Sequence, residues 1–153
     1  MLTWLTIIQT LTTDPVAVAN RLRPVLLQLA RQLRREVHPL GVTGGQVTLL
    51  VSIKHRPGIG LRELAALEGI SPAGMSGHVD RLARARLVER SPDPADRRRV
   101  GLHVTPEGLR VLRLVRSRRT AWLAERLKGL EPHELEAIDA ALEPLARLLE
   151  ASE

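Results

Sequence analysis

The chain has 153 residues, 44% of them hydrophobic, so we expect one domain with a real core and short extensions. It contains no cysteine, which excludes disulfides and thiolate metal sites, and none of its apolar runs approaches the roughly 18 residues of a membrane span. The formal net charge is +6, but residues 81–119 hold twelve arginines against four acids, whereas residues 120–153 hold three bases against eight acids. One basic side beside an acidic tail predicts a surface that faces a polyanion.

The N-terminal stretch MLTWLTIIQTL is expected to form an amphipathic helix with Leu2, Leu5 and Ile8 on one face. The alternative is a secretory leader, but the stretch lacks a positive n-region and a small-residue cleavage site, so we expect the cytoplasm. Asp14-Pro15 then starts a helix that ends near His38-Pro39, with Pro24 predicted to kink it.

Thr43 and Gln46 form a capping box, which predicts a helix to about residue 56. RPGIG at 56–60 leaves room for only a very short strand before a helix at 61–68 that stops at Gly69. Ser71-Pro72 opens a helix whose inward residues are predicted to be Met75, Val79 and Leu82. Two short helices joined by a tight turn with glycine indicate a helix-turn-helix.

Two runs of period two, residues 87–90 and 100–104, surround the polar loop 91–98 and predict a β-hairpin in which Val100, Leu102 and Val104 face inward. Helices are then expected to start at Thr105-Pro106 and at Glu131-Pro132. The fold class is therefore mainly α with a small β-hairpin wing, a winged helix-turn-helix flanked by N- and C-terminal helices. The flanking helices carry more apolar surface than so small a domain can cover, which predicts a homodimer.

We divide the chain into an N-terminal dimerisation segment at 1–40, a DNA-binding winged helix-turn-helix at 41–105 and C-terminal dimerisation helices at 106–153. The segments SPAGMSGHVDRLARARLVER at 71–90 and DRRRVGLHVTPEG at 96–108, in this order of elements, resemble the multiple antibiotic resistance regulator (MarR) family of winged-helix transcription factors. The similarity covers roughly residues 15–150. It implies a homodimer with interlocking terminal helices, each subunit laying the helix 71–84 into a major groove of double-stranded DNA and the wing into a minor groove.

The resemblance also implies which side chains meet DNA. The candidates in the recognition helix are Ser71, Ala73, Gly74, Ser76, Gly77 and Arg81, and those in the wing are Asp96, Arg97, Arg98 and Arg99. By the family's Asp-Arg-Arg pattern, Asp96 would hold the wing arginines and Arg97 or Arg98 would enter the minor groove, where a guanidinium is attracted by the narrow groove's potential. Arg99 is expected to contact phosphate. The alternative for all three wing arginines is a solvated charged turn. Arg84, Arg86 and Arg90 either add phosphate contacts or form a solvated face.

Three features depart from the family pattern. Gly74 and Gly77 stand where larger side chains are usual, so base-specific contact is expected to be thinner. Arg86 stands where the family commonly has glycine, and a left-handed backbone there would cost it about 1 kcal/mol. His78 occupies a usually aliphatic position and is expected to be a satisfied core residue.

Many members of the family are released from DNA by small aromatic or anionic effectors, which bind between the dimerisation helices and the winged helix. One or two of the arginines at 110, 113, 116, 118 and 119 are candidates to attract such an anion, and Trp122 is expected to fill the core or the dimer interface. No metal-ligand spacing, catalytic constellation or phosphate loop occurs, so we expect no metal, no cofactor and no enzyme. The prediction is a ligand-responsive repressor that binds an inverted-repeat operator, and the alternative is a winged helix that coats nucleic acid or mediates interactions without an operator.

Overall fold

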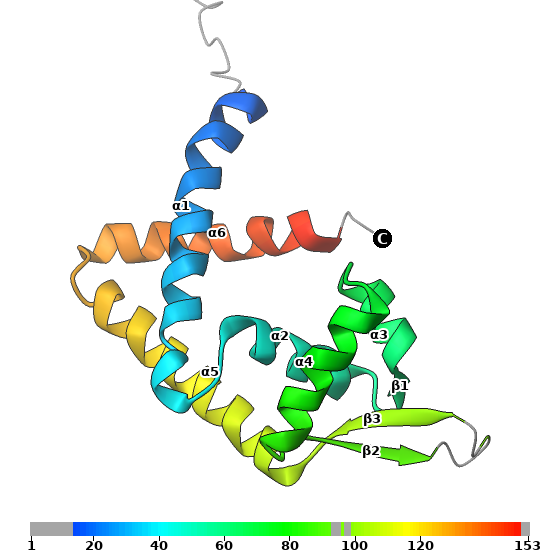
Figure 1. Cartoon of the computed structure of the whole chain (residues 1–153). Coiled ribbons are helices and arrows are strands. Elements are labelled where there is room, and N and C mark those ends of the chain that lie inside the picture. The colour runs from blue at the N-terminus through cyan, green and yellow to red at the C-terminus, as the bar shows by residue number, and fades with distance from the viewer. Residues whose placement is uncertain (1–13, 93–95, 97–98, 151–153) are drawn as a thin grey trace, which may run out of the picture.

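A computed structural model describes residues 14–92, 96 and 99–150 of the chain. The residues predicted to form an N-terminal amphipathic helix, 1–13, lie outside them. In chain order the elements are α1 (Pro15–Arg35), a 3₁₀ turn (His38–Leu40), α2 (Gly44–His55), β1 (Ile59–Gly60), α3 (Leu61–Leu67), α4 (Pro72–Arg84), β2 (Val88–Pro92), β3 (Val100–Val104), α5 (Pro106–Leu127) and α6 (Pro132–Glu150) (Figure 1). None of these described helices is long and apolar enough to cross a membrane.

The predicted helix starts are confirmed, and those of α1, α2, α4 and α5 each have a side-chain cap. Asp14 caps α1 by accepting from the amides of Val16 and Ala17, and the capping box of Thr43 and Gln46 is complete at the start of α2. A side-chain oxygen that accepts from the first turn's unpaired amides stabilises a helix by about 1 kcal/mol. The left-handed Gly69, at φ 64°, follows α3 as predicted.

The three strands form one antiparallel sheet in the order β1-β3-β2. Ile59 pairs with Leu102 at one edge, and Val88 pairs with Val104 at the other. The core lies between this sheet and helices α2, α3, α4 and α5, and its largest fully buried side chains are Val37, Leu50, Ile53, Leu64, Met75, Val79, Leu82 and Leu102. The inward face predicted for α4 is thus confirmed.

The start of α5 is locked against the wing. Thr105 caps α5 by accepting from the amide of Gly108 at 3.0 Å, and its hydroxyl donates to the carbonyl of Arg86 at 2.6 Å. A Cβ on Gly108 would lie 2.3 Å from the carbonyl oxygen of Leu87, so only glycine allows the helix to approach this closely. The orientation of α5 therefore depends on the end of the recognition helix and on β2.

Two expectations for the wing are corrected. Val100 is 50% exposed rather than inward, because it pairs with Pro92 at the end of the hairpin, beyond the helices that cover Leu102. Strand β2 extends to Pro92, so the connection between the strands is shorter than the predicted loop 91–98.

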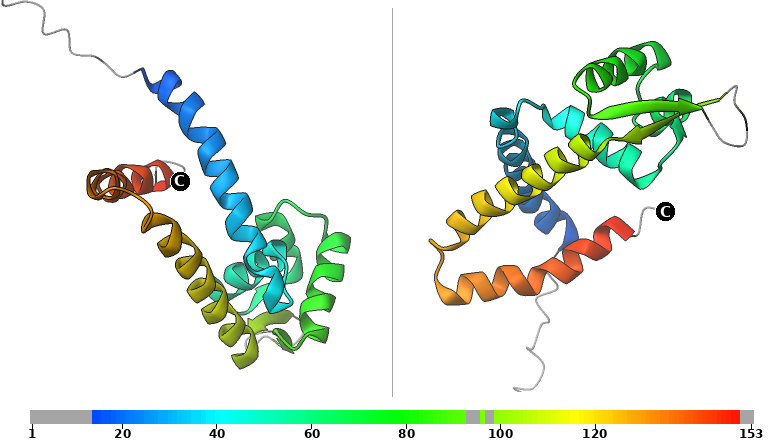
Figure 2. Two further views of the ribbon diagram at one scale, coloured as in Figure 1. Left: turned by 90° about the vertical axis from the view of Figure 1, so that its left-hand side faces the viewer. Right: turned by 90° about the horizontal axis from the view of Figure 1, so that it is seen from below.

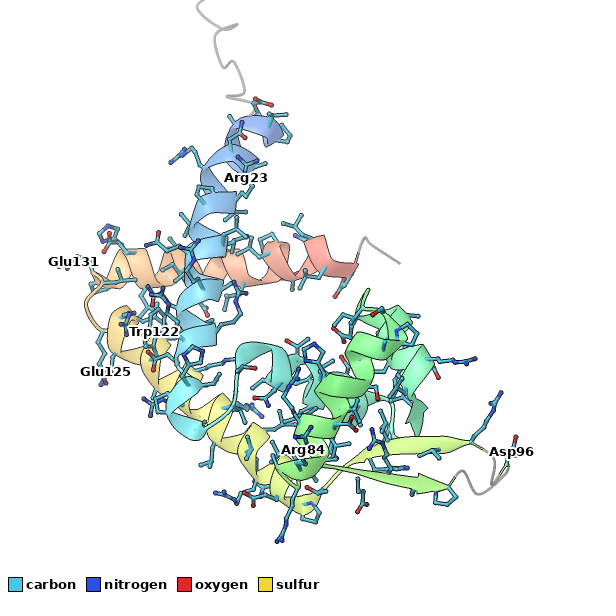
Figure 3. The ribbon with its side chains drawn as sticks, in the orientation of Figure 1. Arg23, Arg84, Asp96, Trp122, Glu125 and Glu131 are labelled. Carbon is cyan, nitrogen blue, oxygen red and sulfur yellow. The ribbon has the colours of Figure 1, made fainter. Side chains whose placement is uncertain are left out.

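Helices α1, α5 and α6 form an arm that leaves the winged helix, with α6 at the far end of α5 (Figures 1 and 2). Neither α1 nor α6 contains a buried residue in this chain. Trp122 of α5 lies half-buried beside Val25 and Leu29 of α1, and the guanidinium of Arg126 stacks 3.6 Å from its ring centre (Figure 3).

Candidate nucleic-acid interface

Helix α4 presents its N-terminal half to solvent. Ser71 caps the helix by accepting from the amide of Gly74 at 3.2 Å. The predicted candidates divide into the exposed Ser71, Ala73, Gly74 and Arg81 and the half-buried Ser76 and Gly77. All six therefore reach the surface of one helix while Met75, Val79 and Leu82 anchor its other side.

The two glycines of α4 differ in the space around them. A Cβ on Gly74 would lie 3.2 Å from both Ile70 Cγ2 and Ser71 Oγ, so a side chain there would press on the turn that caps the helix. A Cβ on Gly77 would meet only Arg81 Nη1, at 3.8 Å, which is an ordinary van der Waals distance. Close packing thus explains the glycine at 74 but not the one at 77.

The expectation that His78 is a core residue is wrong. His78 is half-buried, and its Nδ1 lies 2.8 Å from Nη2 of Arg81. The inward positions of α4 are already taken by Met75, Val79 and Leu82, and a residue directly before Val79 lies to the side of that stripe. His78 therefore belongs to the exposed surface together with Arg81.

Arg86 is left-handed, with φ 59°, as its position after α4 suggested. The amide of Leu87 donates to the carbonyl of Leu82 at 2.9 Å, and the amide of Arg86 donates to the carbonyl of Ala83 at 2.9 Å. These two bonds and the burial of Leu82 and Leu87 make a Schellman motif. An arginine thus occupies a conformation that favours glycine.

An ion pair connects the recognition helix to the wing. Arg90 of β2 donates to Asp80 of α4 at 2.8 Å, with both side chains about two-fifths exposed. Sequence reasoning placed Arg90 on a phosphate-contacting or solvated face and did not pair it with Asp80. The pair links β2 to α4 and occupies part of the hydrogen-bonding capacity of Arg90.

The wing carries its charge at the far end of the hairpin. Asp96 is exposed there, and its carbonyl accepts from the amide of the exposed Arg99 at 2.8 Å (Figure 3). Arg97 and Arg98 lie outside the described residues, so their predicted roles stay predictions. A hollow of about 780 Å³ between α3 and the wing has Arg62 and Arg99 on its wall. Arg62 is a cation of this face that sequence reasoning did not single out.

The five arginines between residues 110 and 119 of α5 have different partners and positions. Arg110 pairs with Glu107 and, by its hydrogen bonds, holds the pKa of that carboxyl below its ordinary value. The remaining pairings are Arg118 with Glu36 at 3.6 Å and Arg119 Nε with the carbonyl of Leu33 at 3.1 Å, and Arg113 and Arg116 line a shallow outer pocket.

A crevice of about 330 Å³ lies between α2 and α5. Its lining is apolar at Val47, Val51, Leu112, Val115 and Leu123 and otherwise formed by Lys54, His55, Arg116, Arg119 and Thr120. Two of the predicted arginines are thus at a crevice between α5 and the winged helix. Its residues on α2 were not predicted, because they come from a segment some 60 residues away in sequence, and no spacing rule connects the two.

Comparisons with known proteins agree with this geometry. A family model described as the MarR family matches residues 42–100, from just after the 3₁₀ turn to the first residue of β3. A crystal structure of a putative transcriptional regulator from Pseudomonas aeruginosa is 30% identical, with a TM-score of 0.75, and the match covers 93% of this chain and 99% of that one. The chain belongs to the MarR family.

Curated relatives of this MarR-family chain are named as regulators. An uncharacterized HTH-type transcriptional regulator of Mycobacterium bovis is 29% identical over 135 residues, which are 88% of this chain and 94% of the relative. The HTH-type transcriptional repressor MdtR of Bacillus subtilis is 26% identical over 114 residues, 74% of each chain. The chain is accordingly a DNA-binding transcriptional regulator with a winged helix, and not an enzyme.

Proposed function

We propose that the chain is a homodimeric repressor that binds an inverted-repeat operator and is released from it by a small anionic effector. The observation that carries the proposal is that α5 contacts or adjoins three parts of the molecule: the surface of α4 and the wing, the crevice, and the helices α1 and α6. The exposed face of α4 and the wing lie at its start, the cationic crevice lies along it, and the unburied helices α1 and α6 lie beside and beyond it. This is the division into segments 1–40, 41–105 and 106–153 that we propose for the chain.

The DNA contact is proposed to use α4 in a major groove and the wing in the neighbouring minor groove. Support comes from the exposure of Ser71, Ala73, Gly74 and Arg81 on α4 and of Asp96 and Arg99 on the wing. The pair of Asp80 and Arg90 holds these two parts in one orientation, so both can meet the same duplex. Phosphate contacts would release counterions and make the affinity fall steeply with salt.

Support for a second copy comes from apolar exposure and from charge. On α6, Leu142 is 56% and Leu148 62% exposed, and on α1, Val16 is 65% and Leu27 58% exposed. Many large apolar side chains exposed on the same helices are typical of an interaction site. Helix α1 carries five arginines and no acid, whereas α6 carries five acids and one arginine, giving charges of +5 and −4. A basic helix of one copy is therefore suited to pack against an acidic helix of the other.

The dimer is tested by sedimentation equilibrium. Leu142→Glu should raise the dimer dissociation constant by at least about a hundredfold, because it places a charge in an apolar interface. Leu67→Glu on α3, where the side chain is 45% exposed and outside the proposed interface, is the matched control and should leave the dimer intact. A wild-type chain that sediments as a monomer would refute the proposal.

The operator is tested by fluorescence anisotropy with the DNA upstream of the chain's own gene. A repressor of its own operon should retain this duplex in an excess of random DNA, with two half-sites about one helical turn apart as a twofold dimer requires. Loss of binding in the presence of random DNA would favour the alternative, a winged helix that coats nucleic acid. The likeness to a named repressor supports repression, and repression of an operator places the protein where the chromosome is, in the cytoplasm.

The effector is proposed to be an anion with an aromatic body, because the crevice combines apolar walls with Lys54, Arg116 and Arg119. The probe is benzoate, with benzamide as an uncharged control of the same shape. Benzoate should weaken operator binding of the wild-type chain and act less on Arg116→Ala, whereas benzamide should have no effect. Equal effects of both compounds would show that the cations do not select the ligand.

A further inference from the structure

The contact between His78 and Arg81 has a defined direction. The guanidinium of Arg81 is always protonated and can only donate, so Nδ1 of His78, 2.8 Å away, must be the acceptor. Nδ1 therefore carries no hydrogen when this contact forms, and the ring N–H is at Nε2. Arg81 uses one N–H in this bond and keeps four others.

The side chain of Arg81 lies over the glycine at 77. Long side chains of a helix point back toward its N-terminus, over the residues three and four positions earlier. Arg81 follows this rule, since Nη2 lies at His78 and Nη1 lies 3.8 Å from where a Cβ of Gly77 would be. The absence of a side chain at 77 leaves the outer face of the helix open for the guanidinium.

This placement brings the guanidinium of Arg81 toward the N-terminal half of α4, which is the half proposed to contact bases in a major groove. Ala73, Gly74 and Gly77 of that surface supply no side-chain hydrogen bond of their own. The neighbouring carboxylate of Asp80 is paired with Arg90 at 2.8 Å, so it is turned toward the wing rather than toward Arg81.

We propose that His78 positions Arg81 over Gly77 so that the guanidinium reads one guanine in each half-site of the operator. The pairing suits guanine because an arginine donates two parallel hydrogen bonds to O6 and N7 in the major groove. An unrestrained arginine side chain loses rotamer entropy when it binds guanine, whereas a side chain already held by His78 loses less. His78 is thus a positioning residue and Arg81 the reader. The proposal depends on the operator recognition proposed above.

The test is selection of binding sites from a library of random duplexes with the full-length protein, followed by anisotropy titrations on duplexes that differ at one base pair. The wild-type chain should enrich a palindromic motif with one fixed guanine in each half. Arg81→Ala should reduce the preference for that guanine by about five- to a hundredfold. His78→Leu should reduce it by about two- to tenfold. His78→Asn should restore it, because Oδ1 is attached to Cγ as Nδ1 is and accepts the same hydrogen bond.

Two controls separate positioning from folding. The thermal midpoint and the affinity for random duplex should be the same in His78→Leu and in the wild-type chain, because the hydrogen bond that is lost is exposed. An unchanged guanine preference in His78→Leu, or a His78→Asn variant that behaves like His78→Leu, would overturn the proposal and leave the operator standing. A wild-type chain that enriches no motif would refute the operator itself, and the proposal with it.

Discussion

The left-handed arginine at the end of α4 predicts a substitution that stabilises the protein. At φ 59° an L-residue other than glycine is strained by about 1–2 kcal/mol. Glycine removes this strain but adds unfolded-state freedom that costs about 0.5–1 kcal/mol. The balance predicts that Arg86→Gly raises the free energy of unfolding by about 0.5–1 kcal/mol, or the thermal midpoint by about 1–4 °C.

The matched comparison is alanine against glycine at two neighbouring positions. At Arg86 the glycine variant should be the more stable, because the two hydrogen bonds of the Schellman motif require this backbone conformation. At Arg84, exposed and within the last turn of α4, the alanine variant should be the more stable by about 0.5–1 kcal/mol. Both pairs lose an arginine, so differences in net charge cancel within each pair.

The assay is urea unfolding followed by circular dichroism at one fixed protein concentration, because the stability of the proposed dimer would depend on its concentration. Equal slopes for all variants would show that the surface exposed on unfolding is unchanged. An Arg86→Ala variant as stable as Arg86→Gly would refute the strain argument, since it would mean that the left-handed backbone costs alanine nothing here.

The remaining predictions concern the start of α5 and the wing. Gly108→Ala should destabilise the protein by about 1–3 kcal/mol in the same assay, because the new Cβ would lie 2.3 Å from a backbone oxygen. Gly45→Ala is the control, since it is also in the first turn of a threonine-capped helix but its new Cβ would lie 3.9 Å from the nearest atom. This variant should not be destabilised. A destabilised Gly45→Ala would show that the close contact is not the cause. Arg97→Ala and Arg98→Ala together should weaken DNA binding at least about tenfold at fixed salt and leave the proposed dimer intact. The slope of log affinity against log salt should fall by up to about 3.6, because each of the two subunits would lose two cations. Unchanged affinity and slope would remove the wing from the mechanism.

The helix boundaries and the side of α4 that is buried could be read from the sequence. Asp14, Thr43, Ser71 and Thr105 each accept a hydrogen bond from an amide two or three residues later, so a cap is decided within one turn of chain. The spacing of Met75, Val79 and Leu82 is likewise a local property, since a helix repeats every 3.6 residues whatever it packs against. The resemblance to the family rested on short segments of this kind, and the family model covers the first of them, 71–90, and the start of the second, 96–108.

Only the tertiary structure decided what lies opposite each of these elements. The exposure of Val100 depends on where the helices that cover the sheet stop, and the pairing of Asp80 with Arg90 depends on how the wing returns to α4. The crevice joins α2 to α5, which are separated in sequence by the whole helix-turn-helix and wing. The physical reason is that periodicity and capping depend only on the neighbours of a residue along the chain. A pocket or an ion pair depends instead on the angle at which two distant elements pack. That angle is set by close contacts such as that of Gly108 with Leu87.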